Sequence, residues 1–294
     1  MEDWTEYGDW AIGLAFLWGA IWGSFFNVVI HRLPDGASLS KPPSHCPSCK
    51  NSLKPWHNIP VLSWLVLRGK CGFCDTTISI RYPLVELVTG LLSAAVWILV
   101  VHSDGGALVR DVGPLALVGP FLLLFAFVGA LVVITFIDLD LQIIPHKITL
   151  PFILTGPLAA FWLEPVTGLT WSYSILGAIA GGGIIWLVIE GYFWVRKREG
   201  MGGGDFMMLA MLGSWLGVEC IIFILLAASL QGLAAAGLFV LARPSAEEGA
   251  EDEDESLRYM AIPFGPFLAL GGLEWLFFKP WIMEVIYGLY GIEA

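Results

Sequence analysis

The chain has 294 residues, of which 57% are hydrophobic and only 14% are charged, and its mean hydropathy is +0.75. A soluble domain of this composition could not cover its surface with polar groups. Long apolar runs with few charges are typical of transmembrane helices, so the sequence predicts an integral membrane protein in a lipid bilayer. No basic stripe interleaved with aromatic residues is present, and a nucleic-acid partner is therefore not expected.

The apolar segments predict eight transmembrane helices. In chain order they cover roughly residues 10–30, 83–101, 115–137, 148–166, 173–195, 205–218, 219–242 and 259–278. The sixth segment is short, and a turn around Gly217 separates it from the seventh. Short helices are tolerated where backbone lines a cavity. Small residues from Gly177 to Gly183 predict close helix–helix packing.

The positions of Lys and Arg indicate the orientation in the membrane. With the N-terminus outside, 13 of the 15 basic residues face the cytoplasm, and only Arg110 and Lys279 lie outside. The positive-inside rule therefore favours both termini outside. Seven acidic residues between Glu247 and Glu255 then lie in a cytoplasmic loop at about 243–258, which we interpret as a solvated segment. An acidic surface for a basic substrate segment is the alternative.

Four cysteines form two CxxC pairs with 21 residues between them: Cys46 and Cys49, then Cys71 and Cys74. Two such pairs can complete a closed tetrahedral site for zinc, which would be structural because no position stays open for water. Disulfides are the alternative, but cytoplasmic thiols stay reduced. A metal would also explain how a loop of about fifty residues folds with little core. The nearby His31, His45 and His57 are expected at the surface, and Cys220 in an apolar segment is expected to be buried.

Carboxylates beside the apolar segments are candidate functional groups, because charge is costly in a membrane. Asp138 and Asp140 end the third predicted helix, and Asp205 begins the sixth. The predicted orientation places them at one depth, where two carboxylates could activate water, one ionised and one protonated. Gly202 to Gly204 would leave room for a substrate backbone and allow positive φ. Alternatively, Asp205 could be only a helix cap, and Asp138 or Asp140 could be only an interfacial charge.

Other signatures of enzymes and pumps are absent from the sequence. It contains no Gly-x-Ser-x-Gly, HExxH, Walker A or GxGxxG pattern. Glu86 and Glu190 lie near the ends of predicted helices and are expected to reach the interface or to pair with Lys or Arg.

The chain resembles the bacterial type IV prepilin peptidases, the GxGD membrane aspartic proteases that also act as N-methyltransferases. The resemblance is carried nearly end to end by GAIWGSFFNVVIHRLP, CPSCK, WHNIPVLSWLVLRGKCGFC, ISIRYPLVELVTG, IDLDLQIIPHKITLP, GMGGGDFMMLAMLG and IPFGPFLALGG. The combination is specific, whereas the Gly-x-Gly-Asp pattern ending at Asp205 is not specific by itself.

The resemblance implies cleavage of the basic leader of prepilins or pseudopilins at the cytoplasmic face of the bacterial inner membrane. It also implies methylation of the new N-terminus with S-adenosylmethionine. The catalytic pair maps to Asp138 and Asp205, since the first aspartate of the family stands seven positions before a proline, here Pro145. The four cysteines map to the cysteines of the family. Two positions depart from its common pattern, Met207 where a lysine is usual and His146 where Asp or Asn is usual.

The expected organisation has three parts. Residues 1–30 form a tail and the first helix, 31–82 a cytoplasmic zinc-binding loop domain, and 83–294 a transmembrane peptidase domain. The expected fold is an all-α polytopic membrane protein. Two other functions stay open at this point. A presenilin-like GxGD protease lacks support because no Tyr-Asp or Pro-Ala-Leu motif is present. A zinc-organised scaffold or a transporter would need no catalytic pair.

Overall fold

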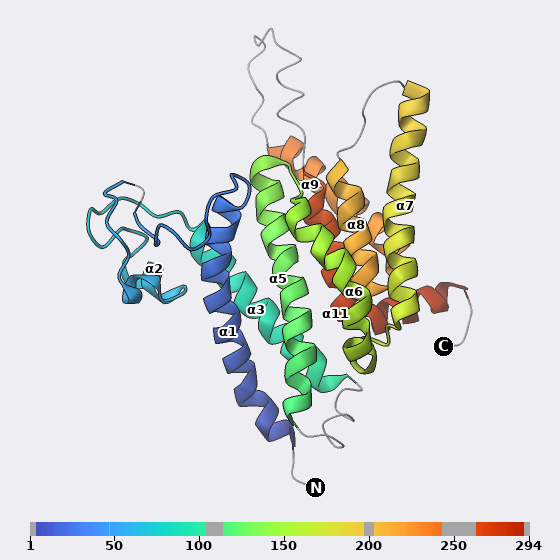
Figure 1. Cartoon of the computed structure of the whole chain (residues 1–294), viewed down its shortest axis with the longest axis horizontal. Helices are drawn as coiled ribbons and strands as arrows, with labels where there is room; N and C mark the ends of the chain where they lie inside the picture. Colours follow the sequence, from blue (N-terminus) through green and yellow to red (C-terminus); the bar gives the residue numbers. More distant parts are fainter. Residues whose placement is uncertain (1–3, 47, 104–113, 197–202, 243–262, 291–294) are drawn as a thin grey trace. The chain divides into compact units, whose positions relative to one another are not determined.

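The structure, a computed structural model, describes residues 4–46, 48–103, 114–196, 203–242 and 263–290 (Figure 1). Its long helices are α1 (Trp4–Arg32), α3 (Arg81–His102), α5 (Val118–Leu141), α6 (His146–Thr167), α7 (Trp171–Arg196), α8 (Gly203–Leu216), α9 (Cys220–Ala242) and α11 (Gly265–Tyr290). Short helices are η1 (Pro55–Asn58), α2 (Leu62–Val66) and η2 (Pro114–Leu117). The described residues contain two isolated β-bridges and no strand. The predicted all-α fold is confirmed, and each predicted apolar segment corresponds to a helix. The acidic loop at 243–258 lies outside the described residues.

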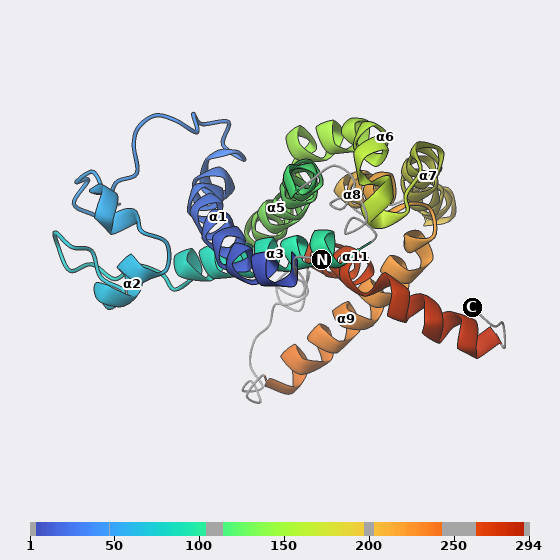
Figure 2. The same ribbon diagram turned by 90° about the horizontal axis from the view of Figure 1, so that it is seen from below.

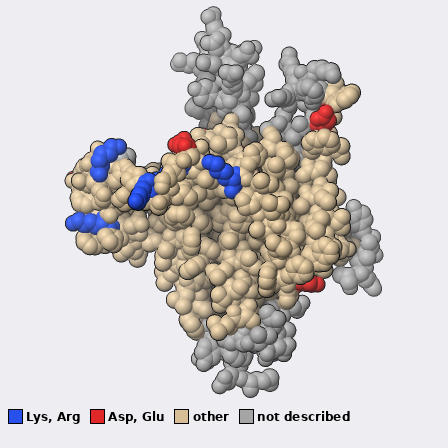
Figure 3. Space-filling view, viewed as in Figure 1, with Lys and Arg blue, Asp and Glu red and all other residues tan. Residues whose placement is uncertain are grey.

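Five helices of the described chain are long and apolar enough to cross a membrane. They are Trp10–Arg32, Arg81–His102, Leu115–Leu141, His146–Thr167 and Cys220–Phe239. Helix α8 has only 14 residues. Such a helix is about 21 Å long, shorter than the hydrocarbon core of about 30 Å. Figure 3 shows Lys and Arg gathered over the loop between α1 and α3, while broad uncharged areas cover the helices on that face. The protein is therefore a polytopic membrane protein.

The chain divides into two compact units. The first comprises Met1–Ile137 and Leu158–Thr170, and the second comprises Asp138–Pro157 and Trp171–Ala294. In the first unit α1, α3 and α5 lie side by side (Figures 1 and 2). A Cβ atom at Gly19 would lie 2.4 Å from Ser93 Cβ. The Ser93 hydroxyl donates a hydrogen bond of 2.7 Å to the carbonyl of Ala15. Small residues thus bring the backbones of α1 and α3 close together.

In the second unit α8 is the central helix, and its residues Met208–Leu216 are all buried. Glycines allow α7 to pack closely on it, since a Cβ atom at Gly177 would lie 2.1 Å from the Gly213 carbonyl oxygen. Ser174 donates a hydrogen bond of 2.5 Å to the Ser214 carbonyl. The predicted packing role of the small residues is confirmed for Gly177. Gly217 ends α8 with φ of 89°, at the turn that the sequence predicted.

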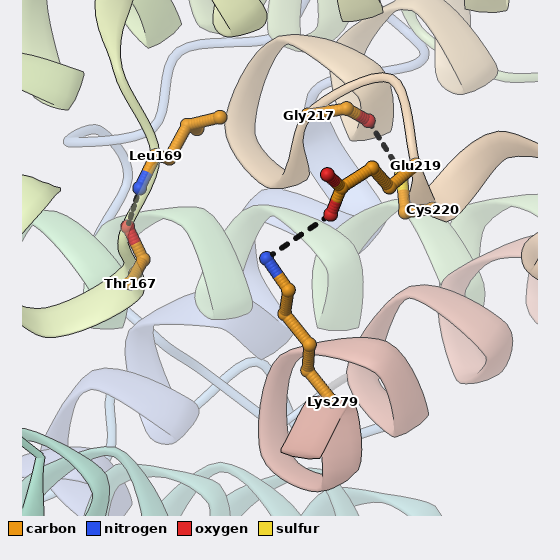
Figure 4. A network of polar contacts seen from close by, with 6 residues as sticks. All are labelled: Thr167, Leu169, Gly217, Glu219, Cys220 and Lys279. Atoms are coloured by element: carbon orange, nitrogen blue, oxygen red, sulfur yellow. Dashed lines mark hydrogen bonds and ion pairs between the residues drawn. The ribbon is translucent and has the colours of Figure 1, made fainter. Parts of the chain in front are cut away.

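Helix α11 extends twelve residues beyond its predicted end and contains Pro280. Figure 4 shows Lys279 of this helix paired with Glu219 in the turn before α9, at a distance of 3.4 Å between Nζ and Oε2. In the same turn, Cys220 Sγ donates a hydrogen bond of 3.0 Å to the carbonyl of Gly217. Cys220 is fully buried, as predicted. At the α8–α9 turn, Glu219 therefore has a charged partner and the Gly217 carbonyl has a hydrogen-bond donor.

Candidate functional site

Asp138 lies in the last turn of α5 and is only 4% exposed. The helix ends shortly after it, because Gln142 adopts a left-handed conformation with φ of 54°. The N–H of Gln142 donates a hydrogen bond of 2.9 Å to the carbonyl of Asp138. The side chain of Asp138 also has a partner: the backbone N–H of Gly265 donates to its Oδ2 atom, at 3.0 Å. The carboxylate is therefore fixed by a group distant in sequence.

Asp205 lies in the first turn of α8, where its side chain is half-buried. It is close enough to Asp138 for the two carboxylates to interact electrostatically. The exposed N–H groups at a helix N-terminus favour an acidic side chain there. The structure therefore brings the two aspartates together from the end of one helix and the beginning of another, within the second unit. Asp140, the alternative candidate, is exposed at the end of α5.

The glycines before Asp205 differ in part from the expectation. Gly203 and Gly204 are the first described residues of α8, and neither is among the described glycines with a positive φ. A Cβ atom at Gly204 would lie 2.8 Å from Ile144 Cβ. The missing side chain at Gly204 therefore leaves room for Ile144, in the connection between α5 and α6. Among the described residues, a Cβ atom at Gly203 would have only Phe206 nearby, at 3.7 Å. Gly202 lies outside the described residues.

Gly265, at the beginning of α11, is a site residue that the sequence analysis did not single out. Its contribution is a backbone N–H, which has no signature in side-chain chemistry. The Gly265-Pro266 pair in the sequence does indicate the start of a helix here, since proline is common in the first turn. The two positions that depart from the family pattern lie on other helices: His146 is exposed at the start of α6, and Met207 is half-buried in α8.

Two other membrane-proximal carboxylates have structural partners. Glu86 Oε2 accepts a hydrogen bond of 2.7 Å from the backbone N–H of Val61. Val61 has φ of 60°, which is unfavourable for a β-branched residue, so this bond helps to hold a strained turn beside α2. Glu190 accepts a hydrogen bond of 3.0 Å from the indole N–H of Trp194. Neither of these partners is the Lys or Arg that was expected.

Cys46, Cys49, Cys71 and Cys74 form one cluster in the first unit, and their four Sγ atoms lie within 4.8 Å of one another. All four are free thiols in the structure. Four sulfur ligands at such distances could hold one metal ion. Cys46 and Cys71 are buried, Cys49 is half-buried and Cys74 is exposed. The predicted gathering of the cysteines is confirmed.

Each CxxC pair sits in a turn with the same backbone hydrogen bonds. In the first turn, the Cys46 N–H donates to the Asn51 carbonyl (3.0 Å), and Lys50 N–H donates to the Cys46 carbonyl (3.0 Å). The second turn repeats both bonds 25 positions later, from Cys71 to Thr76 (2.8 Å) and from Asp75 to Cys71 (3.2 Å). Lys50 and Asp75 share a left-handed backbone, with φ of 58° and 55°. We call these turns, residues 44–53 and 69–78, the two knuckles.

Side chains support the cluster. Hydrogen bonds with the hydroxyl and the backbone N–H of Thr76 lower the pKa of Cys74 to about 6, which favours the thiolate that binds metals. The Lys54 ammonium lies over the rings of both Trp56 and Phe73, 5.3 Å and 5.7 Å from their centroids. His57 is half-buried rather than at the surface as expected, and its ring packs edge-on against Phe73 at 5.2 Å.

His31 is exposed, as expected, whereas His45 is half-buried. The Nδ1 atom of His45 lies 3.0 Å from the Pro43 carbonyl.

Comparison with known proteins identifies the chain's relatives. Residues 17–100 match the bacterial peptidase A24 N-terminal domain, and residues 125–237 match the type IV leader peptidase family. No solved structure gives a significant match.

Several curated proteins are similar over nearly their whole length. A prepilin leader peptidase/N-methyltransferase of Neisseria gonorrhoeae is 35% identical, covering 95% of this chain and 93% of the relative. Proteins with the same name from Burkholderia pseudomallei and Aeromonas hydrophila are 36% and 38% identical, over 91% and 88% of this chain. The coverage of the relatives is 85% and 88%. The chain therefore belongs to the type IV leader peptidase family.

Proposed function

We propose that this protein is a membrane aspartic endopeptidase that removes the leader of type IV prepilins or pseudopilins and methylates the new N-terminus. The observation that supports the peptidase activity most directly is the pairing of Asp138 with Asp205 in one unit. The relatives' name, prepilin leader peptidase/N-methyltransferase, supports both the substrate and the second activity.

The pairing suits activation of a water molecule. One aspartate, in its ionised form, accepts a proton from water, and the resulting hydroxide oxygen attacks the scissile carbonyl carbon. The other aspartate, in its protonated form, donates a hydrogen bond to the carbonyl oxygen as negative charge develops on it. Collapse of the tetrahedral intermediate breaks the C–N bond, and the aspartate that accepted the proton from water returns it to the leaving amine. Two carboxylates near each other favour this shared-proton state, because both cannot easily be ionised together.

Two further groups complete the proposal. The four cysteines would hold zinc, which would cross-link the two knuckles in a structural site. S-adenosylmethionine would supply the methyl group for the new N-terminal amine, and we assign no residue to its binding. Residues 31–82 would form the metal-binding loop domain and residues 83–294 the peptidase domain.

The proposed location is the bacterial inner membrane, with the N-terminus outside and both the zinc loop and the aspartate pair at the cytoplasmic face. The distribution of Lys and Arg supports this orientation, since 13 of the 15 basic residues then lie inside. A basic leader in the cytoplasm could reach the pair while the apolar segment of the substrate enters the membrane.

Three matched variants test the peptidase assignment. Asp138→Asn and Asp205→Asn each remove a carboxylate with little change in shape, and each should lower cleavage of a prepilin by about 100-fold or more. Asp140→Asn, two positions from Asp138 and exposed, should keep normal cleavage. Purified full-length variants are incubated with a prepilin and the product is followed on a gel. Normal cleavage by either of the first two variants, at normal expression, would refute the assignment.

The product of the same reaction tests the methyltransferase activity. Mass analysis of its N-terminal residue should show one added methyl group only when S-adenosylmethionine is supplied. An unmethylated product from active enzyme in the presence of the donor would refute this second activity.

A further inference from the structure

We propose that Gly265 is a positioning residue for the catalytic pair. Its backbone N–H, at the beginning of α11, holds the carboxylate of Asp138, and only a residue without a side chain leaves space for that carboxylate. This inference rests on the proposed function, because it gives Asp138 a catalytic role.

The N–H of Gly265 is available because of how α11 begins. The first N–H groups of a helix have no partner inside the helix. Here the Phe264 carbonyl accepts hydrogen bonds from the N–H groups of Phe267 and Leu268, both at 3.1 Å. Pro266 has no N–H. The N–H of Gly265 donates instead to Asp138 Oδ2, at 3.0 Å.

The contact also compensates for the unfavourable position of Asp138. This residue lies in the last turn of α5, where the carbonyl ends of the helix disfavour a negative charge. The N-terminus of α11 presents the opposite partial charge to the same carboxylate. Both groups are buried, so water does not screen the interaction strongly. The beginning of α11 therefore provides a polar partner that α5 itself cannot offer.

Steric space makes glycine necessary at this position. A Cβ atom at Gly265 would lie 2.5 Å from Asp138 Oδ2 and 3.1 Å from its Cγ. The next nearest atom, Ile144 Cδ1, would be 3.3 Å away and belongs to a flexible end. Any side chain must therefore displace the carboxylate, and a misplacement of about 1 Å at a reacting group costs about 100-fold in rate.

The test compares two glycines of α11 in the full-length protein. Gly265→Ala should lower kcat for prepilin cleavage by about 100-fold and leave KM within about threefold, because the catalytic group moves while the substrate site stays. Gly271→Ala is the matched control. A Cβ atom there would have its nearest neighbour, in Ile224, at 3.4 Å, which is ordinary contact, and both constants should stay near those of the unchanged protein. Thermal unfolding is measured for both variants.

A double variant separates displacement of Asp138 from crowding of Ile144. Ile144→Val removes the Cδ1 atom that a Cβ atom at Gly265 would approach. It therefore relieves the contact with residue 144 and leaves the contact with Asp138 unchanged. Gly265→Ala combined with Ile144→Val should therefore keep the low kcat. If Gly265→Ala alone does not fold, kcat is measured on the double variant instead. Recovery of kcat in it would overturn the inference, as would a kcat for folded Gly265→Ala within about threefold of normal.

The experiment distinguishes failure of the peptidase assignment from failure of the inference about Gly265. If the unchanged protein does not cleave the prepilin, the peptidase assignment fails, and the positioning role fails with it. If the unchanged protein cleaves and Gly265→Ala cleaves equally well, only the role of Gly265 is wrong.

Discussion

Ile144 lies against two glycines that border the aspartate pair. A Cβ atom at Gly204 would lie 2.8 Å from its Cβ and 3.4 Å from its backbone N. These atoms are close to the main chain and cannot move aside as the end of a long side chain can. The fit between α8 and the α5–α6 connection therefore depends on the absence of a side chain at Gly204.

Gly204→Ala should consequently destabilise the protein, by about 1–3 kcal/mol for overpacking at a rigid contact. Gly203→Ala, one position earlier, is the matched control, since the nearest atom of the described residues would be 3.7 Å away. There the higher helix propensity of alanine should leave the stability unchanged or raise it by up to about 1 kcal/mol. Thermal unfolding of the two purified variants in one detergent measures the difference, and equal midpoints would contradict the steric argument.

At the same scale, the sequence singled out two candidate aspartates, Asp138 and Asp205, that lie near each other in the structure. The spacing from Pro145 favours Asp138 over Asp140 as the catalytic candidate. In the structure Asp138 is buried against Gly265, whereas Asp140 is exposed. The part played by Gly265 could not be predicted. A backbone donor acts through its position in space, and this position depends on how α11 meets the end of α5.

The two knuckles are the elements that carry the candidate metal site. Cys46→Ser should remove bound zinc from the purified protein, because a serine hydroxyl is not an effective zinc ligand. Residues 31–82 should then be cut faster by a protease, since the metal would support a segment with little core. Elemental analysis and limited proteolysis measure the two effects.

Cys220→Ser provides the control for this experiment. Cys220 is buried in α9, where its Sγ atom donates to the Gly217 carbonyl, and a serine hydroxyl can donate in the same way. This variant should keep its zinc. Zinc retained by Cys46→Ser, or lost equally by both variants, would contradict the four-cysteine site.

Helix positions followed well from apolar length, but some boundaries did not. The predicted end of the last helix at residue 278 came just before Lys279 and Pro280, a charge and a helix breaker. In the structure α11 continues to Tyr290, and Lys279 pairs with Glu219. The short helices η1 and α2 were not predicted at all. Their turn at Val61 depends on Glu86, 25 positions away, and local sequence patterns do not report such a contact.

For the whole molecule, the main expectation concerns its orientation in the membrane. A chain fused to alkaline phosphatase after Ser103 should give active phosphatase, because the end of α3 is expected outside. A fusion after Gln142 should be inactive, because the end of α5 is expected inside. Fusions to β-galactosidase at the same two positions should give the opposite pattern. Activity of the Gln142 phosphatase fusion would place the aspartate pair outside and contradict the charge argument.

The matching geometry of the two knuckles has a consequence for how the loop folds. Each knuckle is closed by its own short-range hydrogen bonds, so each half of the site presents its two sulfur atoms without help from the other half. A bound metal ion would then only have to join the two knuckles, which closes the loop of chain between them. The entropy of closing such a loop grows only with the logarithm of its length. The connecting segment between the knuckles could therefore lengthen or shorten by several residues at little cost in metal affinity, whereas a single residue inserted within a knuckle would break the site.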